Sequence, residues 1–590
     1  MPDSKNLVVA IVLSLVILLG FQYFYELPRM RAQQEAQQAQ QAIQQAQQAQ
    51  QVPRPGAVGS SVPTIPGTAV EPAAAAKVDR AAIVGQSGRV RIQSSRIIGS
   101  IALEGGRIDD ITLVTYRQTI DPQSPPITVL NPTGTPDAYY VEVGWVPGDG
   151  ATTVPNDKTR WTADRTTLTP EQPVILTWDN GQGLRFTRQY ALDRDFMITV
   201  TSRVENSTTQ PVTVLPYALI ARSGTPVTEG FYILHEGPIA VLNDVLREHD
   251  YSKVEKAKDG TITESSTGGW LGITDKYWLV SLIPEPKEEI KARFVYTKPD
   301  NRDRYQADYL GAPRQVAGGA TTTATHRVFA GAKEVQLLAR YRDELGIQRF
   351  DDAVDWGWFH FLTKPIFQAL DWIYGRVGNF GIAILILTVV VKLLFFPLAN
   401  RSYVMMSRMK ALTPEMTAMR ERFGEDRQRL NQEMMALYKK HQVNPVSGCF
   451  PVLLQIPVFF SLYKVLFVTI EMRHAPFYGW IHDLSAHDPT TLLNLFGLIP
   501  FTPPHILDPI SIGAWPIIMG ITMFLQQKLN PQPADPIQAK VFMFMPLIFT
   551  FMLGQFAVGL VIYWSWNNLL SMAQQWVIMK RTMAATAKAK

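Results

Sequence analysis

Apolar residues in this chain are grouped into long runs, and this grouping restricts the possible folds more than any other feature. The clearest run is FGIAILILTVVVKLLFFPLAN at 380–400, about as long as a helix that crosses a lipid bilayer. A run from Val541 to about Leu570 is too long for one helix, and Gly554 and Gln555 near its middle predict a tight turn between two helices. The chain is therefore expected to be an α-helical membrane protein, with spans at 1–27, 378–400, 449–470, 510–527, 540–554 and 557–579.

The N-terminal residues predict an anchor followed by a linker. The first span, 1–27, follows Lys5 and lacks a cleavage site made of small residues. It is therefore expected to be a retained anchor rather than a cleaved signal peptide. Residues 28–81 are rich in Gln and Ala and then in Pro and Gly, a composition typical of a linker.

Residues 82–345 predict a β-domain. They contain short β-rich runs separated by Gly, Pro, Asn and Asp, and apolar residues alternate at Phe196, Ile198 and Val200. About 250 residues of such strands fit one large antiparallel β-sandwich. The last residues of this segment, 334–345, are expected to be helical.

Two further segments flank the second span. Residues 355–376 are rich in Trp, Phe and Tyr with interspersed charges, which predicts an amphipathic helix in the membrane interface or, alternatively, one docked on the β-domain. Residues 401–446 favour helix with a break at FGED, 423–426, which predicts a helical hairpin. Its methionines could form an adaptable surface for apolar segments or pack the hairpin itself: Met405, Met409, Met416, Met419 and Met434. Its arginines could contact lipid head groups or ribosomal RNA.

The distribution of basic residues predicts the topology. Lys and Arg of short loops stay on the cytoplasmic side of a membrane. The loop 471–509 contains Arg473 alone, and the tail 580–590 is basic. The hairpin 401–446 is rich in basic residues, namely Arg401, Arg408, Lys410, Arg420, Arg422, Arg427, Arg429, Lys439 and Lys440. Both termini and the hairpin are thus expected in the cytoplasm, and the β-domain outside, across an inner membrane.

Polar residues inside the spans predict a shared cavity. An ionisable residue at membrane depth is costly and indicates a functional site, and Lys392 is such a residue. Counted at about 1.5 Å per residue from the cytoplasmic ends, Gln455 lies about 9 Å deep, Lys392 about 12 Å, and Thr388, Asn567 and Asn568 about 17 to 18 Å. These side chains could share a hydrated cavity. The alternatives are a lysine that reaches the interface and amides that join helices.

Signatures of catalysis or metal binding are absent from the sequence. It contains no GxxxxGK[ST], HExxH or GxSxG motif, so no enzyme activity and no cofactor are expected. The loop WIHDLSAHDP at 480–489 lacks regular ligand spacing, so no metal site is expected there. No span has an acidic residue in its interior, which argues against a proton or sodium relay.

Three segments of the C-terminal part are distinctive: MRERFGEDRQRLNQEMMALYKKHQVNPVSGCFPVLLQIPVFFSLYKVL at 419–466, APFYGWIHDLSAHDP at 475–489, and the FMPLIFTFM and GLVIYWSWNNL stretches within 544–569. In these segments the chain closely resembles the YidC/Oxa/Alb family of membrane protein insertases. The resemblance implies an N-terminal anchor helix, a periplasmic all-β super-sandwich domain and a five-helix insertase core with a cytoplasmic helical hairpin. The core of this family encloses a hydrophilic groove open to the cytoplasm and to lipid.

The resemblance also implies a function and groove residues. Members insert nascent inner-membrane proteins, alone or with the Sec translocon, and help them to fold. Lys392 stands where the family has an arginine, which puts in doubt any role that needs a bidentate guanidinium but not one that needs a positive charge. Thr388 matches a groove threonine, and Tyr563 and Trp564 match a pair of tyrosines associated with substrate contact. The implied partners are nascent membrane proteins, the Sec translocon, ribosome or signal recognition components and membrane lipids, and not DNA.

Two other functions remain open from the residues alone. A cationic cavity could belong to an anion channel or transporter, although the sequence shows no inverted repeat. The β-domain could instead be the functional part, as a membrane-anchored periplasmic sugar-binding module, although no convergent pair of carboxylates is visible.

Overall fold

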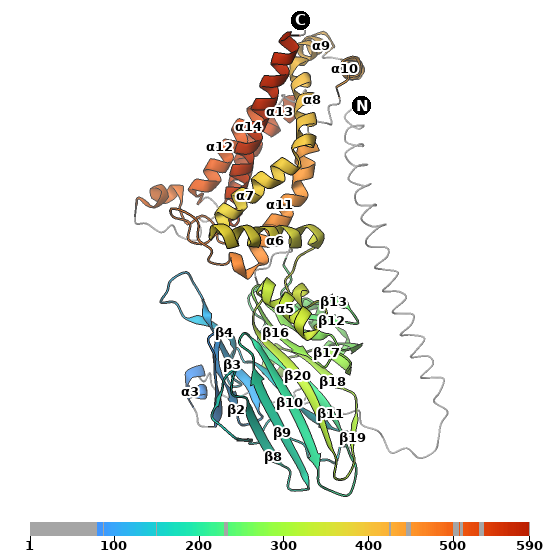
Figure 1. Ribbon diagram of the computed structural model, residues 1–590. Helices are drawn as coiled ribbons and strands as arrows, with labels where there is room; N and C mark the ends of the chain where they lie inside the picture. The colour runs from blue at the N-terminus through green and yellow to red at the C-terminus, as the bar shows by residue number, and fades with distance from the viewer. Residues whose placement is uncertain are drawn as a thin grey trace, which may run out of the picture.

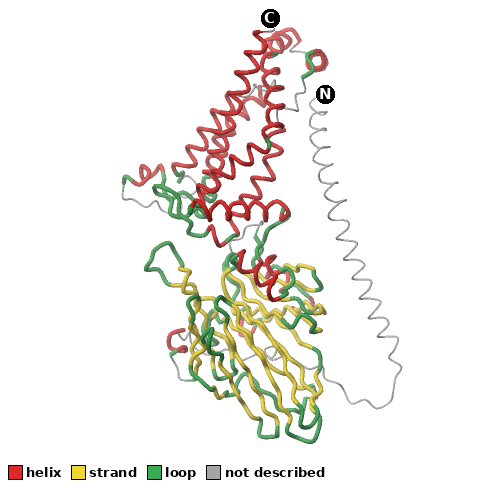
Figure 2. The backbone as a smooth tube through the Cα atoms, viewed as in Figure 1, coloured by secondary structure: helices red, strands yellow, loops and turns green. Residues whose placement is uncertain are grey.

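The computed structural model describes residues 79–588, except 86–87, 149, 229–233, 424–425, 444–449, 500–506, 508–510 and 530–535. The predicted anchor at 1–27 and nearly all of the linker at 28–81 lie outside these residues. The described residues form a β-domain and a bundle of helices stacked on one end of it (Figure 1). Figure 2 shows that strands are confined to the first part and that helices dominate the second.

The β-domain contains two sheets. The first has the order β14-β17-β18-β11-β5-β3-β2-β1-β7, with β19 beside β11 and β4 beside β3. Its strands are β1 Arg89–Gln93, β2 Ile97–Ala102, β3 Arg107–Arg117, β4 Pro126–Leu130, β5 Tyr139–Pro147, β7 Thr167–Leu168, β11 Val212–Ser223, β14 Thr261–Thr267, β17 Glu289–Thr297, β18 Arg304–Gly311 and β19 Arg314–Val316.

The second sheet has the order β13-β12-β15-β16-β20-β10-β9-β8-β6. Its strands are β6 Thr162–Ala163, β8 Val174–Asp179, β9 Leu184–Leu192, β10 Met197–Asn206, β12 Gly237–Leu242, β13 Val245–Glu248, β15 Trp270–Thr274, β16 Trp278–Ile283 and β20 Thr321–Ala332. The central pair β10 and β20 is antiparallel, with Val200 opposite His326.

Alternation along the strands builds the core between the sheets. Phe196, Ile198 and Val200, which the sequence places on one face, are fully buried. Because strand side chains alternate between two faces, each such strand contributes every second residue to a common core. The prediction of a β-rich domain followed by helices is confirmed.

Short helices complete the β-domain. They are α3 Arg80–Val84, α4 Tyr251–Glu255 and α5 Val335–Leu345. The last of these ends the domain near the helical bundle (Figure 1) and buries Val335, Leu338 and Tyr341. Gly346 follows in the left-handed conformation, with φ 66°, which only a residue without a side chain adopts at little cost.

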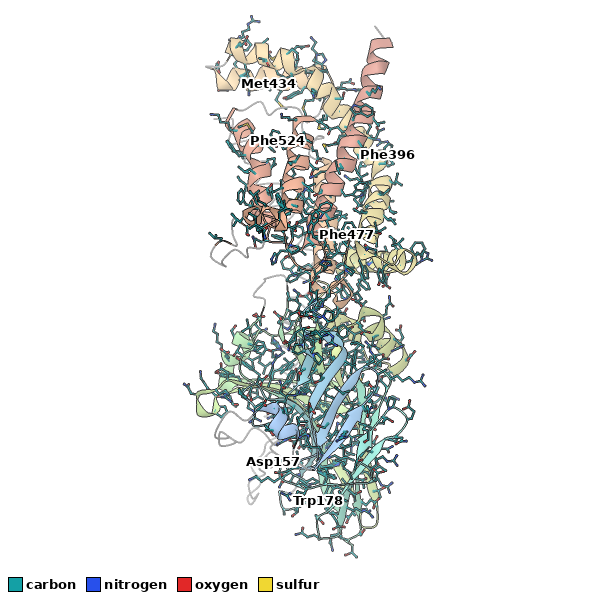
Figure 3. The ribbon with its side chains drawn as sticks, turned by 90° about the vertical axis from the view of Figure 1, so that its left-hand side faces the viewer. Asp157, Trp178, Phe396, Met434, Phe477 and Phe524 are labelled. Atoms are coloured by element: carbon teal, nitrogen blue, oxygen red, sulfur yellow. The ribbon has the colours of Figure 1, made fainter. Side chains whose placement is uncertain are left out.

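The bundle contains the remaining helices. They are α6 His360–Val377, α7 Phe380–Leu394, α8 Phe396–Ala411, α9 Thr413–Phe423, α10 Arg427–Lys440, α11 Phe450–Val468, α12 Ala514–Leu529, α13 Pro536–Leu553 and α14 Val558–Lys588. Helices α9 and α10 form a hairpin at the end of the bundle far from the β-domain (Figure 1); α9 ends at Phe423 and α10 begins at Arg427. Figure 3 places Met434 in this hairpin and Phe477 at the opposite end.

Two helices differ from the predicted segments. The segment expected as one span at 378–400 is broken at Phe395, where α7 and α8 meet at a bend of 68°. Pro397 in the first turn of α8 has no amide hydrogen to continue the α7 ladder, which explains the break. Helix α14 continues past the expected end at 579 to Lys588, because the tail 580–590 contains no Gly or Pro.

Among the residues that the structure describes, no single helix has both the length and the apolar composition expected of a membrane span. Helices α7 and α8 meet that test when they are taken together across their bend.

Helix α6 lies across the end of the bundle nearest to the β-domain (Figure 1). Its buried face, which includes Phe367 and Leu370, packs against α7 and α11. Its other face exposes Phe361 and Trp372. This arrangement matches an amphipathic helix with an aromatic outer face.

Buried polar groups join the β-domain to the bundle. Asp355, between the two parts, accepts hydrogen bonds from the His235 amide at 2.9 Å and from the Lys464 ammonium of α11 at 2.8 Å. Nearby, the fully buried Lys333 donates to Thr274 at 2.9 Å. Burial lowers the pKa of Lys333 to about 8, and the charge of Asp355 opposes this shift. Asp355 is therefore the shared acidic neighbour of two ammonium groups.

Glu471 makes a second contact across this junction. Its Oε1 accepts a hydrogen bond of 2.8 Å from the Val335 amide, which is an otherwise unpartnered donor of the first turn of α5. Burial raises the pKa of Glu471 to about 7, although this hydrogen bond lowers it. The junction is therefore expected to respond to pH near neutrality.

The pH response of this contact can be predicted with its sign. The pKa of Glu471 is higher in the folded state than in the unfolded state, so the protonated carboxyl group favours folding. This contribution is complete below the ordinary pKa of 4.5 and is lost as the pH rises through about 7. We expect hydrogen exchange in the first turn of α5, corrected for intrinsic rates, to be slowest near pH 5. At pH 8 the opening free energy should be lower by up to about 3 kcal/mol.

Glu471→Gln provides the control for this prediction. The amide oxygen of glutamine still accepts a hydrogen bond from Val335, but the side chain does not ionise. Corrected exchange in this variant should be the same at pH 5 and pH 8. A variant that keeps the pH dependence of the parent chain would show that another group is responsible.

Candidate functional site

Lys392 lies on α7 less than one turn before the bend at Phe395, and it faces α14. Its ammonium donates a hydrogen bond of 2.7 Å to the Ser571 hydroxyl, which in turn donates to the Asn567 carbonyl at 2.8 Å. In the parts of the chain that the structure describes, no carboxylate forms an ion pair with Lys392. The ammonium is thus a half-buried positive charge held by neutral groups.

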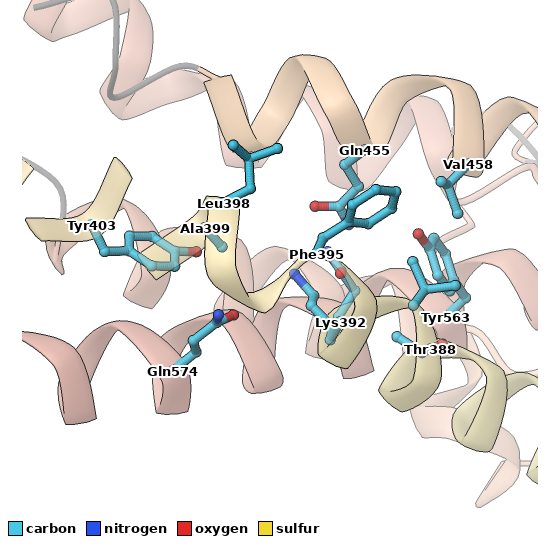
Figure 4. Close-up of a pocket in the computed structure, with 12 residues that line it drawn as sticks. Thr388, Lys392, Phe395, Leu398, Ala399, Tyr403, Gln455, Val458, Tyr563 and Gln574 are labelled. Carbon is cyan, nitrogen blue, oxygen red and sulfur yellow. The ribbon is translucent and has the colours of Figure 1, made fainter. Parts of the chain in front are cut away.

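A cavity of about 40 Å³ lies beside this ammonium (Figure 4). A water molecule needs roughly 10 to 15 Å³ of such space, so the cavity has room for two or three. It is lined by Thr388, Val391, Lys392, Phe395, Leu398, Ala399, Tyr403, Gln455, Val458, Tyr563, Asn567 and Gln574. Polar and apolar side chains of α7, α8, α11 and α14 therefore meet at one small cavity.

The bend at Phe395 shapes this cavity. It turns α8 so that Leu398, Ala399 and Tyr403 line one end, beside Gln574 of α14 (Figure 4). Tyr403 also makes a hydrogen bond with Ser571, the partner of Lys392. A straight helix would carry these side chains away from the cavity.

The cavity is closed at its other end by apolar packing. On α7, Ile384 lies one turn before Thr388 and Leu387 lies directly before it; both are buried, as are Leu462 and Leu466 of α11. These residues lie toward the ends of α7 and α11 that meet α6 and the β-domain (Figure 1). The polar space therefore ends within the bundle and does not continue to the β-domain.

Five of the seven predicted groove residues line the cavity. They are Thr388, Lys392, Gln455, Tyr563 and Asn567. The Thr388 hydroxyl donates within its own helix, to the Ile384 carbonyl at 2.7 Å, whereas the Tyr563 hydroxyl is hydrogen-bonded to Gln455. Gln455 and Tyr563 therefore supply polar groups that bridge two helices at the closed end.

Trp564 and Asn568 lie outside the cavity. Trp564 packs edge-on against Phe459, with ring centroids 4.6 Å apart, and Asn568 donates to the Thr522 hydroxyl of α12 at 3.2 Å. Each follows a cavity residue by one position, and one residue turns a helix by about 100°. They therefore face the neighbouring helices.

Ser571 and Tyr403 were not expected in the site. Ser571 is four residues after Asn567, which is four after Tyr563, so the three share one face of α14. This spacing was visible in the sequence and could have identified Ser571. Tyr403 was not predictable in this way, because its place depends on the bend of α8.

The hairpin methionines occupy different environments. Met434 is buried, and Met416 is half-buried and contacts the Tyr438 hydroxyl. Met405, Met409 and Met419 are half-buried as well. Met434 therefore packs the hairpin, whereas Met435 beside it is 62% exposed.

The acidic residues of the loop 480–489 serve as local hydrogen-bond acceptors. Asp483 accepts from Ser485 and from the His474 amide, and Asp488 accepts from Thr490 and Trp480. Within the described ranges, no group of three His, Cys, Asp or Glu residues is placed to hold a metal ion.

Comparison with known proteins extends over both parts of the chain. The family model described as YidC periplasmic domain matches residues 89–369, and the model described as 60Kd inner membrane protein matches 372–586. The "Membrane protein insertase YidC" of Methylorubrum extorquens (strain PA1) is 52% identical over 593 residues, covering 98% of this chain and 95% of that protein. The chain belongs to the YidC family of membrane protein insertases.

Two further matches also extend over most of the chain. The "Membrane protein insertase YidC" of Bradyrhizobium diazoefficiens is 50% identical over 600 residues, covering 98% of this chain and 97% of that protein. A solved structure, "Active YidC insertase crystal structure with the first transmembrane domain resolved", is 17% identical with a TM-score of 0.35, and the match covers 86% of this chain and 94% of that one. The family resemblance expected from the sequence is confirmed, and the YidC family is one of insertases rather than enzymes.

Proposed function

We propose that this chain inserts nascent membrane proteins into the bacterial inner membrane and helps them to fold, alone or beside the Sec translocon. The observation that carries this proposal is the lone ammonium of Lys392 in a polar cavity closed toward the β-domain. Membership of the YidC family supports it. The cavity and its residues Thr388, Lys392, Gln455, Tyr563 and Asn567 are the substrate groove in this proposal.

The proposed topology follows the distribution of basic residues. Helices α7, α11, α12, α13 and α14 cross the membrane together with the anchor at 1–27, and α6 lies in the outer interface. Both termini and the α9–α10 hairpin are cytoplasmic, and the β-domain is periplasmic. In this orientation the open end of the groove, beside Tyr403 and Gln574, faces the cytoplasm.

The proposed mechanism is physical and forms no covalent intermediate. A hydrated groove that reaches part of the way through the membrane shortens the apolar path of a polar segment. The Lys392 ammonium attracts acidic residues of that segment. The apolar spans of the substrate then leave sideways into lipid, because their burial there is favourable.

The partners follow from this mechanism. Nascent chains reach the groove from the cytoplasmic side, where the basic hairpin is available to ribosome or signal recognition components and to lipid head groups. An anion channel is disfavoured because the residues that follow the cavity toward the β-domain, Ile384, Leu387, Leu462 and Leu466, are buried apolar side chains.

Site-specific photocrosslinking tests this function. A photoreactive amino acid is placed at Tyr563, which lines the cavity, or at Trp564, the adjacent residue that packs on Phe459. A ribosome-stalled nascent chain with one apolar span should crosslink from position 563 and not from position 564. Equal crosslinking from both positions, or none from 563, would exclude the cavity as the substrate path.

A further inference from the structure

The loop between η6 Ile470–Met472 and α12 carries an exposed apolar patch. Residues 490–499, TTLLNLFGLI, contain no charged side chain. The patch consists of exposed Leu492, Leu493, Leu495, Phe496, Leu498 and Ile499, and Leu498 is 84% exposed. A contiguous apolar patch of this kind marks an interaction surface.

The backbone of this patch is strained. Within η7 Leu492–Gly497, Leu495 has φ 48° and Phe496 has φ 58°, the left-handed region that bulky residues rarely adopt. The conformation is held by hydrogen bonds from the Phe496 amide to the Thr491 carbonyl at 2.8 Å and from the Gly497 amide to the Asn494 side chain at 2.9 Å. Strain of this type persists where it serves a function.

The loop is fixed to the first turn of α12. Asp488 accepts a hydrogen bond from the Trp515 amide at 2.9 Å, and Thr490 accepts one from the Ala514 amide at 3.0 Å. The Leu492 amide donates to the Ile512 carbonyl at 2.9 Å. The patch is therefore held at the N-terminal end of α12, which is the end of the bundle nearer to the β-domain (Figure 1).

We propose that residues 490–499 form an apolar wedge that inserts into the outer leaflet of the membrane. The proposal rests on the topology of the proposed function, in which α12 is a span whose N-terminal end lies at the periplasmic surface. The wedge then lies at the level of α6, whose Trp372 and Phe361 are also exposed.

Lipid fits this surface better than a protein partner does. Helix α12 also exposes Ile518 and Ile521, about one and two turns beyond the Ala514 and Trp515 amides that hold the loop, so the wedge and this helix both offer apolar side chains to lipid. A protein interface normally adds a polar rim, whereas residues 490–499 offer only Thr and Asn as polar side chains. The wedge anchors α12 laterally, because its backbone is tied to the first turn of that helix.

Fluorescence quenching in vesicles tests the wedge. Cys449 is the single cysteine, so single labels are introduced in a Cys449→Ser background. The full chain is labelled with an environment-sensitive dye at Leu498→Cys, at Ile548→Cys on the exposed face of α13, or at Gln182→Cys in the exposed turn between β8 and β9. The vesicles contain phosphatidylcholine and phosphatidylglycerol, with a nitroxide on the upper acyl chain.

The lipid nitroxide should quench the label at 498 at least threefold more than the label at 182, and aqueous iodide should quench it less. If the nitroxide quenches the label at position 548, but quenches the label at 498 no more than the label at 182, the wedge is excluded. The protein would still be embedded in the membrane. If 498 is protected from iodide but not quenched by the nitroxide, protein covers the patch and the proposal is wrong. If 548 also behaves like 182, the topology and the wedge both fail.

Discussion

Replacing Lys392 with alanine is expected to reduce insertion of substrates that carry an acidic tail by about tenfold. A carboxylate 4 Å from an ammonium gains roughly 1 kcal/mol in bulk water and 4 kcal/mol near a protein surface. The half-buried ammonium beside a small hydrated cavity lies between these limits. A loss of about 1.4 kcal/mol corresponds to the tenfold effect. The measurements are complementation of a depleted strain and insertion into proteoliposomes.

Matched variants separate the charge from other properties of the side chain. Lys392→Arg keeps the positive charge and should retain activity, and Lys392→Met keeps the length of the chain and should behave like alanine. Ser571→Ala removes the hydrogen-bond partner of the ammonium but not the charge, so it should have a small effect. A substrate with Asn in place of its acidic residues should be insensitive to all four changes. Full activity of the alanine variant would remove Lys392 from the mechanism.

Depth along a helix was predictable for this site, but direction around the helix was not. The rise per residue placed Thr388, Lys392 and Asn567 near one level, and all three line the cavity. The same argument included Asn568, which faces α12. Direction depends on which helices pack against α14, and a single sequence does not contain that information.

The sequence predicted individual strands of the fold but not how they pair. Alternating apolar residues identified β-strands such as β10, since each strand needs one buried face. The pairing of β10 with β20 joins residues more than a hundred positions apart, and no local pattern specifies it. The bend at Phe395 could have been inferred from Pro397, but the long apolar run at 380–400 concealed it.

Lys464 is the clearest example of information outside the local sequence. It lies within the predicted span 449–470, and the sequence of that segment does not show which group it pairs with. The structure pairs it with Asp355, which is more than a hundred residues earlier, at 2.8 Å. The pair joins the bundle to the segment that leaves the β-domain, so its importance follows from tertiary structure alone.

Asp355→Asn is expected to destabilise the junction between the β-domain and the bundle by about 3 to 5 kcal/mol. The Lys464 and Asp355 side chains are 10% and 17% exposed, and loss of one member of a buried pair leaves an uncompensated charge. Asp355 also accepts hydrogen bonds from the His235 and Gly357 amides. Limited proteolysis of the segment 346–359 in detergent, with increasing denaturant, measures the change.

The double variant Asp355→Asn with Lys464→Met decides whether the charge or the shape of this junction matters. Methionine keeps most of the lysine stem but has no ammonium to desolvate. If the desolvated charge of Lys464 causes the loss, the double variant should be more stable than Asp355→Asn alone, because that ammonium no longer lies beside the asparagine and the remaining one, Lys333, keeps its hydrogen bond to Thr274. The loss in the double variant could instead equal the sum of the losses in Asp355→Asn and in Lys464→Met. That result would assign the stability to packing and to the hydrogen bonds from the His235 and Gly357 amides. The ion pair would then be dispensable for holding the two parts of the chain together.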